Sequence, residues 1–226
     1  MRLDKFLVEC GIGSRKEVKD FIDCGKIIIN GAIEKKNNKA IDENSDEISY
    51  EGKKLIFKEF RYYILNKKQG YITAVEDSRD RTVMELLPDW VIRKDLFPVG
   101  RLDKDTEGLL LFTNNGKLAH DLVSPKKHVD KIYHVELRDE ITVEGVKLLE
   151  NGVDIGGYIT KPATVDIVNS KLIHLNIQEG KFHQVKKMLH AIGNEVVFLR
   201  RITFGKLKLG ELSLGEVIEI NLEDIL

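Results

Sequence analysis

The sequence predicts an α+β protein in which a small domain of two helices and a hairpin, residues 1–58, precedes a larger mixed domain, residues 59–226. Two observations support this division. Apolar residues at helical spacing and a hairpin signal lie close together in the first part of the chain, whereas longer strand-like segments alternate with helical ones from Arg61 onward. A chain of 226 residues is long enough to bury a core in each domain.

The first domain is expected to begin with two amphipathic helices. The apolar stripe of the first helix consists of Leu3, Phe6 and Leu7. The apolar stripe of the second consists of Val18, Phe21 and Ile22. Ser14 and Glu17 form a capping box at the start of the second helix, and Gly25 suits its end. Cys10 and Cys24 fall in these helical patterns, so both are expected as small buried apolar side chains.

A hairpin is expected directly after the helices. Residues 26–30 read as a short strand, and Asn30-Gly31 is a strong two-residue turn signal. Residues 32–33 begin the return strand. The polar run 34–46 reads as a loop, and residues 48–50 read as one more short strand.

The second domain alternates strands and helices. The expected strands are 61–67, 109–113, 131–137, 172–177, 196–203 and 217–220. The expected helices are 82–87, 116–123 and 182–192. Pro88 ends the first of these helices, Ser124-Pro125 ends the second, and Gly193-Asn194 ends the third. Together these elements predict a mixed α+β arrangement.

Composition limits the class of protein. The formal net charge is −1, but the segment 181–208 is strongly basic and contains a single acid, Glu195. Its basic residues are Lys181, Lys186, Lys187, Arg200, Arg201, Lys206 and Lys208. A local excess of this size could neutralise several phosphates. No apolar run long enough for a membrane span is present, and no signal region follows Met1, so we expect a cytoplasmic monomer with no membrane partner.

The most unusual local composition is at Gly100–Gly108, where three acids alternate among cations. Asp103, Asp105 and Glu107 match the first positions of a calcium loop, but Asn114 stands where a bidentate acid is needed. A magnesium site for phosphoryl transfer would need phosphate-binding glycines, and the P-loop pattern is absent. A charged turn with local ion pairs is the structural alternative. No metal site is expected.

The start of the chain resembles an S4 RNA-binding domain. The resemblance rests on Arg2–Leu7, Gly13–Arg15 and Gly25–Gly31. It implies RNA contact through the second helix and the hairpin, without chemistry. The basic residues that it offers to RNA are Arg2, Lys5, Arg15, Lys16 and Lys19.

The rest of the chain resembles the pseudouridine synthases of the RsuA branch. Gly100–Gly108, continued by Leu109–Gly116, is similar to their catalytic motif. Lys131-Ile132-Tyr133, preceded by Ser124-Pro125, resembles the second motif, and Glu179–Met188 resembles the third. The order of the motifs behind an S4-like domain is also that of the family. The resemblance implies a catalytic domain with a central, largely antiparallel sheet.

Carried over by position, the resemblance makes Asp103 the essential aspartate and Arg101 the loop arginine that helps to displace the target base. Tyr133 would stack on the target uracil, and Lys186 would pair with Asp103. Many relatives have arginine where Lys186 stands, and lysine lacks the bidentate fork. Further candidates for RNA contact are Lys181, His183, Gln184 and Lys187. The side chains of His183 and Gln184 could equally cap the helix.

The implied reaction breaks the N1–C1′ bond of a uridine, turns the base and rejoins it through C5. Nothing is oxidised and no group is lost, so no cofactor is expected. A carboxylate beside the sugar could attack C1′ or remove the C2′ proton, and the sequence leaves both open. The base must first leave its stack at a cost of a few kcal/mol, which stacking on an aromatic side chain partly recovers.

The leading hypothesis is a 16S rRNA pseudouridine synthase acting on 16S rRNA or a small-subunit assembly intermediate. The form His183-Gln184-Val185-Lys186 resembles the small-subunit enzymes more than the large-subunit ones. Alternatives are a 23S rRNA synthase of the same family and a non-catalytic RNA-binding or ribosome-assembly protein. A metal-dependent hydrolase ranks last. The target uridine does not follow from the sequence.

Overall fold

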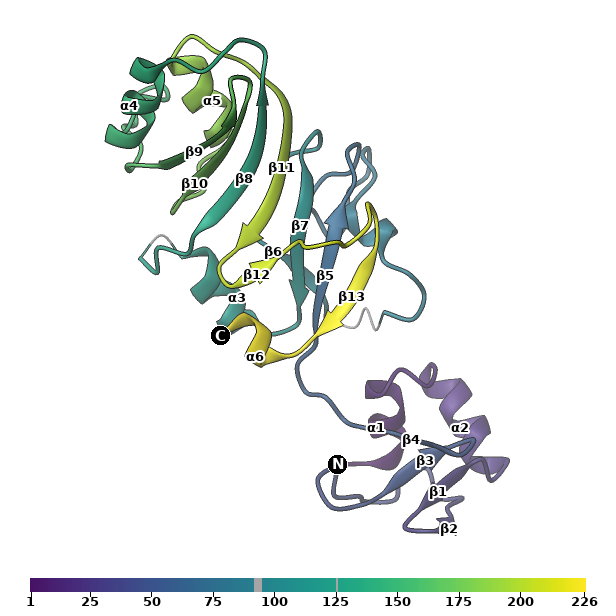
Figure 1. Cartoon of the computed structure of the whole chain (residues 1–226). Helices are drawn as coiled ribbons and strands as arrows, with labels where there is room; N and C mark the ends of the chain where they lie inside the picture. The colour runs from purple at the N-terminus through teal and green to yellow at the C-terminus, as the bar shows by residue number, and fades with distance from the viewer. Residues whose placement is uncertain (92–94, 125) are drawn as a thin grey trace. The chain divides into compact units, whose positions relative to one another are not determined.

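The chain forms two compact units (Figure 1). The computed structural model describes residues 1–91, 95–124 and 126–226. One unit contains Met1–Phe60 and, of the described residues that follow, Trp90 and Val91. The other contains Arg61–Asp89 and Asp95–Leu226. Pro125, which the sequence places at the end of a helix, lies outside the described residues.

The first unit packs two helices on a small antiparallel sheet. Its helices are α1 (Leu3–Glu9) and α2 (Arg15–Asp23). Its strands are β1 (Ile27–Ile29), β2 (Ala32–Ile33), β3 (Ile48–Tyr50) and β4 (Lys53–Lys54), in the order β2-β1-β3-β4. The strand β4 was not expected from the sequence, because its residues are two exposed lysines without an apolar pattern.

The expected caps and apolar stripes account for this unit. The Ser14–Glu17 capping box is present at the start of α2, as the sequence predicts. The buried core includes Leu3, Phe6, Leu7, Val18, Ile22, Ile27 and Ile48. The expectation for the cysteines was wrong. Cys10 is only half-buried and Cys24 is exposed, because each is the C-cap that follows its helix and not part of the apolar stripe.

The second unit is built on one long mixed sheet (Figure 1). Its main strands are β5 (Tyr62–Lys67), β7 (Glu107–Thr113), β8 (Lys131–Leu137), β9 (Thr164–Asn169), β10 (Leu172–Ile177), β11 (Val196–Phe204) and β13 (Val217–Ile220). They run in the order β13-β5-β7-β11-β8-β10-β9. Short strands β6 (Phe97–Val99) and β12 (Leu207–Lys208) pair with β7 and β11. Neighbours are antiparallel except β7 and β11, which run parallel.

Helices lie at the two ends of this sheet. Figure 1 shows α4 (Val143–Asn151) and α5 (Gln184–Ala191) beside the β9–β10 end. The helices α3 (Gly116–Val123) and α6 (Leu222–Ile225) belong to the other end, and the 3-10 turn η1 (Val83–Leu86) follows β5. The strand β7 is buried along its whole length, which explains its continuous apolar sequence. Of the described helices, none is long and apolar enough to cross a bilayer.

Candidate active site

A buried lysine fixes the loop between β6 and β7 that carries Asp103. Lys67, the last residue of β5, is 0% exposed. Its Nζ donates hydrogen bonds of 2.9–3.4 Å to the main-chain oxygens of Lys68, Asp103, Lys104 and Thr106. Burial lowers the pKa of Lys67 to about 8, although the nearby carboxylates of Asp105 and Asp103 act in the opposite direction. The ammonium group therefore ties the main chain of this loop to the end of β5.

Two further anchors hold the same loop from its sides. The hydroxyl of Thr73 donates to the main-chain oxygen of Leu102 at 2.7 Å and accepts from its main-chain nitrogen at 3.1 Å. The main-chain nitrogen of Gly70 donates to the oxygen of Lys104 at 2.8 Å. The loop thus has little freedom to move, which keeps the Asp103 side chain in place.

Gly108 permits the close approach of β7 and β11. Its φ of +105° is unfavourable for other residues, and a Cβ there would lie 2.2 Å from the main-chain oxygen of Arg201 and 2.7 Å from its nitrogen. The parallel register pairs Gly108 with Arg201. The glycine that ends the acidic motif is therefore required by the sheet, and it brings β11 beside the Asp103 loop.

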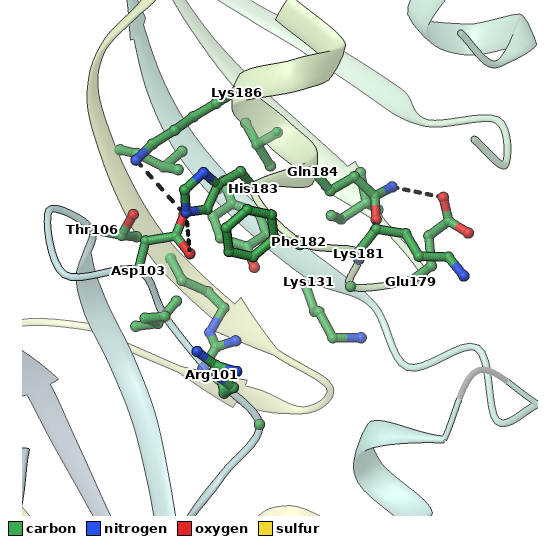
Figure 2. A pocket seen from close by; sticks show the side chains of 18 of the residues that line it. Arg101, Asp103, Thr106, Lys131, Glu179, Lys181, Phe182, His183, Gln184 and Lys186 are labelled. Atoms are coloured by element: carbon green, nitrogen blue, oxygen red, sulfur yellow. Dashed lines mark hydrogen bonds and ion pairs between the residues drawn. The ribbon is translucent and has the colours of Figure 1, made fainter. Parts of the chain in front are cut away.

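Two basic side chains from the third motif point toward Asp103 (Figure 2). Lys186 Nζ lies 3.6 Å from Asp103 Oδ2, and His183 Nε2 lies 3.6 Å from Asp103 Oδ1. The pairing of Lys186 with Asp103, expected from the resemblance, is thus within ion-pair distance. The hydrogen bond of Lys186 goes elsewhere, to Asp105 Oδ1 at 2.5 Å.

Asp105 is the residue that orients Lys186. Partial burial alone would raise the pKa of Asp105, but the hydrogen bond and the charge of Lys186 outweigh it and lower that pKa. Asp105 is therefore ionised at neutral pH and holds the ammonium group between two carboxylates. Beyond the metal-loop alternative, the sequence offered Asp105 only as part of a charged turn with local ion pairs.

The start of α5 has an unusual backbone that presents two rings at the site. His183 is the N-cap, at a φ of +51°, so α5 begins at Gln184 and not at Phe182 as the sequence indicated. The rings of Phe182 and His183 stack with centroids 3.8 Å apart. Phe182 is 67% exposed, and the Nζ of Lys187 lies 5.4 Å from its ring centroid.

A buried hydrogen-bond network holds this turn. Glu179 accepts from Gln184 Nε2 at 2.7 Å and from the Tyr158 hydroxyl at 2.8 Å. Gln184 Oε1 accepts from the main-chain nitrogen of Lys181 at 2.8 Å. Gln184 is only 4% exposed. Of the two roles that the sequence left open, these contacts favour capping and positioning over RNA contact. Lys181 itself is exposed, with its Nζ 4.2 Å from the ring centroid of Tyr158.

These elements surround a cavity of about 430 Å³. Asp103, Arg101, Tyr133 and Lys186, the four residues to which the resemblance gives catalytic roles, all line it. Tyr133 of β8 is 8% exposed, and Arg101 is exposed. The structure therefore brings together in one place the three motifs that are separated in the sequence.

The basic segment 181–208 does not form one solvated face. Arg200 pairs with Glu107, with Nη2 and Oε2 2.7 Å apart. Arg201 is buried, and both it and the buried Lys131 line the cavity. The expected excess of charge is thus partly inside the domain. Alternate residues of β11 point to opposite faces, and a charge count along the sequence does not separate them.

The acidic motif does not form a metal loop. Glu107 is buried against Arg200, whereas Asp103 and Asp105 both pair with Lys186. Among the residues that the structure describes, no group of three His, Cys, Asp or Glu side chains is placed to hold a metal ion.

Comparison with known proteins agrees with the motifs. The sequence pattern of the family described as RNA pseudouridylate synthase matches residues 61–191, and that of the S4 domain matches residues 1–47. The chain belongs to the RNA pseudouridine synthase family. It is an isomerase that acts on RNA, with an S4 RNA-binding domain in front of the synthase domain.

Full-length relatives of this synthase come from several bacteria. It is 47% identical to the RNA pseudouridine synthase YtzG of Bacillus subtilis, covering 100% of this chain and 97% of that protein. It is 36% identical to ribosomal small subunit pseudouridine synthase A of Pasteurella multocida (100% and 98%) and 33% identical to ribosomal large subunit pseudouridine synthase B of Bacillus subtilis (99% and 93%). A crystal structure of a pseudouridylate synthase matches with a TM-score of 0.69 at 34% identity, over 100% of this chain and 98% of that one.

In the S4 domain of the synthase, the candidate RNA contacts lie on the surface. The residues Arg2, Lys5, Arg15, Lys16 and Lys19 are all exposed. Arg2 is engaged by Asp4, since its Nη2 and Nε donate to the two carboxylate oxygens at 2.7 and 3.0 Å. The other four face solvent, and their contact with RNA remains a prediction.

Sequence reasoning missed several residues of the synthase site. The residues concerned are Lys67, Asp105, Lys131, Phe182 and Arg201. Lys67 was expected only as the last residue of a strand, and Phe182 only as the first residue of a helix, so neither carried a signal of a site. The signal available for Lys131 was its place in the second motif, where only the tyrosine was assigned a role.

Proposed function

We propose that this synthase isomerises a specific uridine of 16S rRNA, with Asp103 acting on the ribose of a uridine that has been flipped out of its helix. The observation that carries the proposal is the position of Asp103 on a rigid loop, 3.6 Å from Lys186, at a cavity large enough for a base. The chemistry requires negative charge on this carboxylate, and Lys186 places a positive charge beside it.

The other lining residues fit named roles in this proposal. Tyr133 stacks on the target uracil, at about 1–3 kcal/mol per base. Arg101, exposed at the edge of the cavity, takes the space that the base leaves in the RNA helix. The ring of Phe182 at the same edge stacks on a neighbouring base.

Asp103 either attacks C1′ or removes the C2′ proton. Both reactions need the carboxylate ionised, and in both the uracil departs with the electron pair of the N1–C1′ bond. Lys186 stabilises the carboxylate before the reaction, and Asp105 keeps Lys186 in place. The chemistry involves no oxidation and uses side chains only.

RNA is bound by both units of the chain. The S4 domain, residues 1–58 in our division, contributes Arg15, Lys16 and Lys19 on α2 as phosphate contacts, with Arg2 and Lys5 beside them. In the synthase domain, Lys181 and Lys187 are exposed near the cavity and contact the strand that carries the target. Each phosphate contact adds to the salt dependence of binding.

The choice of 16S rRNA rests on the third motif, His183-Gln184-Val185-Lys186, and on similarity to small-subunit synthases. The second candidate is 23S rRNA, because a large-subunit synthase is similar at 33% identity. The substrate in either case is the RNA itself or a subunit assembly intermediate in the cytoplasm.

Tritium release from RNA labelled at uridine C5 tests the proposal, because rejoining through C5 expels that hydrogen. The synthase is offered 16S rRNA, 23S rRNA and partly assembled subunits of each kind. Release from 16S substrates alone supports the proposal in full. Release from 23S substrates alone keeps the reaction and replaces the substrate, and no release from any of them contradicts the proposal.

A further inference from the structure

Arg201 is a buried arginine that forms no ion pair with a carboxylate among the described residues. It is 2% exposed, and its Nε donates to the main-chain oxygen of Leu109 at 2.9 Å. Its guanidinium group lies 4.8 Å from the ring centroid of Phe204. Within the described structure, Arg201 Nη2 is one of four buried side-chain atoms without a hydrogen-bond partner. It lines the cavity that contains Asp103.

Lys131 is a second buried cation on the same cavity. It is 9% exposed, its Nζ donates to the main-chain oxygen of Val129 at 2.8 Å, and it lies 5.6 Å from the ring centroid of Phe204. Burial, and then the charge of Arg201, lower the pKa of Lys131 to about 8, although the carboxylates of Asp130 and Glu179 act in the opposite direction. The two cations thus repel each other, and both lie near the ring of Phe204.

The carboxylates of Asp130 and Glu179 offset only part of the effect on Lys131, whose pKa stays lowered, and their oxygens bond to other groups. Asp130 Oδ1 accepts from Asn176 and Gln178 at 3.2 and 3.0 Å. Glu179 accepts from Tyr158 and Gln184. Burying a charge or a polar group without a partner is costly, so an arrangement of this kind points to a partner that arrives with the substrate.

The depth of the pair indicates which part of the RNA that partner is. A flipped nucleotide places its base deepest, while its phosphates stay on the strand at the cavity edge. Exposed cations already line the cavity at Arg101 and Lys181. The burial of the pair therefore favours contact with the base over contact with the backbone.

We propose that Lys131 and Arg201 bind the carbonyl oxygens of the target uracil and stabilise the anion that the base becomes when it is detached. This rests on the proposed function. When the N1–C1′ bond breaks, its electron pair stays on the base, and the charge is shared by N1, O2 and O4. C5 then bonds to C1′, the proton on C5 is lost, and N1 takes up a proton. Fixed donors at the charged oxygens favour the broken state over the intact one.

The rotation of the detached uracil is symmetric with respect to its carbonyl oxygens, so donors that stay fixed, such as Lys131 and Arg201, suit it. The base turns about the axis through N3 and C6, which exchanges N1 with C5 and O2 with O4. A donor that binds one carbonyl oxygen in the substrate therefore meets the other in the product. The same two side chains serve the uridine, the detached base and the pseudouridine without moving.

Single-turnover rates at saturating RNA test the proposal in the full-length protein. Lys131→Met keeps the volume and removes the charge, whereas Arg201→Lys keeps a charge and removes the fork. Each is expected to lower the rate about 100-fold, as loss of one oxyanion donor does. Lys147→Met, on the exposed face of α4, is the matched control and keeps the wild-type rate. Thermal melting verifies that each variant is folded.

Two readouts separate this role from a phosphate site and from a purely structural role. The RNA dissociation constant and its salt dependence stay as in wild type if the pair meets the base, whereas weaker binding with a shallower salt dependence marks a phosphate site and overturns the proposal. RNA with 5-fluorouridine at the target carries a base whose anion is more stable but whose C5 has no proton to lose, so the readout is detachment of the base. Loss of intact 5-fluorouridine, followed by chromatography of the digested RNA, should suffer less in Lys131→Met than the reaction of uridine. Equal losses of rate on uridine and 5-fluorouridine mark a purely structural role and also overturn the proposal.

The wild-type reaction keeps the two proposals distinguishable. If wild type releases no tritium from any rRNA, the proposed function itself fails before the variants are compared. If wild type reacts and both variants stay within about threefold of its rate, far from the loss expected of an oxyanion donor, only the inference about Lys131 and Arg201 is wrong.

Discussion

The ammonium group of Lys186 lies 3.6 Å from the carboxylate of Asp103, and a hydrogen bond of 2.5 Å to Asp105 holds it there. Lysine has one compact charge and lacks the bidentate fork of arginine. The second carboxylate supplies the orientation that arginine obtains from its own shape. Asp105 is therefore a positioning residue, and the lysine in the third motif is accompanied by a partner that fixes it.

Removing the charge of Lys186 should slow the reaction without preventing RNA binding. We expect Lys186→Met to lower kcat about 100-fold, because the ionised form of Asp103 loses its adjacent cation. Lys186→Arg should keep most of the activity. Lys187→Met is the control, since this neighbouring lysine is exposed and faces Phe182, and it should change KM only. A normal kcat in Lys186→Met would contradict the role given to the ion pair.

Lys67 should matter for both stability and activity. Lys67→Met leaves up to four main-chain oxygens without their donor, and we expect a loss of about 2–4 kcal/mol in the free energy of unfolding. The Asp103 loop loosens as well, so activity falls in the fraction that remains folded. Urea unfolding of Lys67→Met beside Lys68→Met, its exposed neighbour, measures the effect. Equal stability of the two variants would show that the loop is held without Lys67.

Gly108→Ala tests the close approach of β7 and β11. The added Cβ would lie within 2.7 Å of two main-chain atoms of Arg201, which a packed sheet cannot relieve. We expect the variant to lose most of its folded population. Gly116→Ala is the matched control, because nothing lies within 4 Å of a Cβ there and the residue begins α3. Circular dichroism of both variants measures how much of each is folded. A normally folded Gly108→Ala would contradict the register that pairs Gly108 with Arg201.

Phe182→Ala should weaken RNA binding and leave the fold intact. The ring is exposed at the edge of the cavity, so its removal costs little packing. Loss of one base-stacking contact corresponds to about 1–3 kcal/mol, or roughly 5–150-fold in the dissociation constant. Leu148→Ala, an exposed apolar residue of α4, serves as control in the same filter-binding assay. Unchanged affinity in Phe182→Ala would remove the ring from the RNA contacts.

The pH dependence of both stability and activity should report the loss of the proton from the buried Lys131. Its pKa is about 8 in the folded chain, below the ordinary value of 10.5. Between these values the unfolded chain binds the additional proton, so this group's contribution to the free energy of unfolding rises with pH from about 8 to about 10.5. Activity should move the other way and fall above pH 8, as Lys131 loses its charge. In Lys131→Arg this alkaline fall should move to higher pH, and an unmoved fall would assign it to another group.

The sequence predicts the strands and the principal site residues well where the pattern is local. The apolar run of β7 and the alternation in β8 predict these strands directly, and the three motifs predict that Asp103, Tyr133 and Lys186 share one cavity. The helix α4 and the strand β9 were missed. The residues of β9 are mostly exposed, so the strand has no alternation to detect.

Other parts of the site depend on the sheet and not on local sequence. The burial of Arg201 follows from its pairing with Gly108 across two strands far apart in the chain. The role of Lys67 follows from the loop that folds over the end of β5, some 36 residues later. The left-handed backbone at His183 shortened the predicted helix, because an apolar pattern does not record a change in φ.

We propose that Asp103, and not its neighbour Asp105, is the reacting carboxylate. Both Asp103 and Asp105 pair with Lys186, so Asp103→Asn and Asp105→Asn each remove one negative charge beside the same ammonium group. Tritium release in a single turnover on the rRNA that wild type accepts should be abolished in Asp103→Asn and fall by less than about tenfold in Asp105→Asn, which loses only a positioning contact. Retained release in Asp103→Asn, or complete loss in Asp105→Asn alone, would contradict the account.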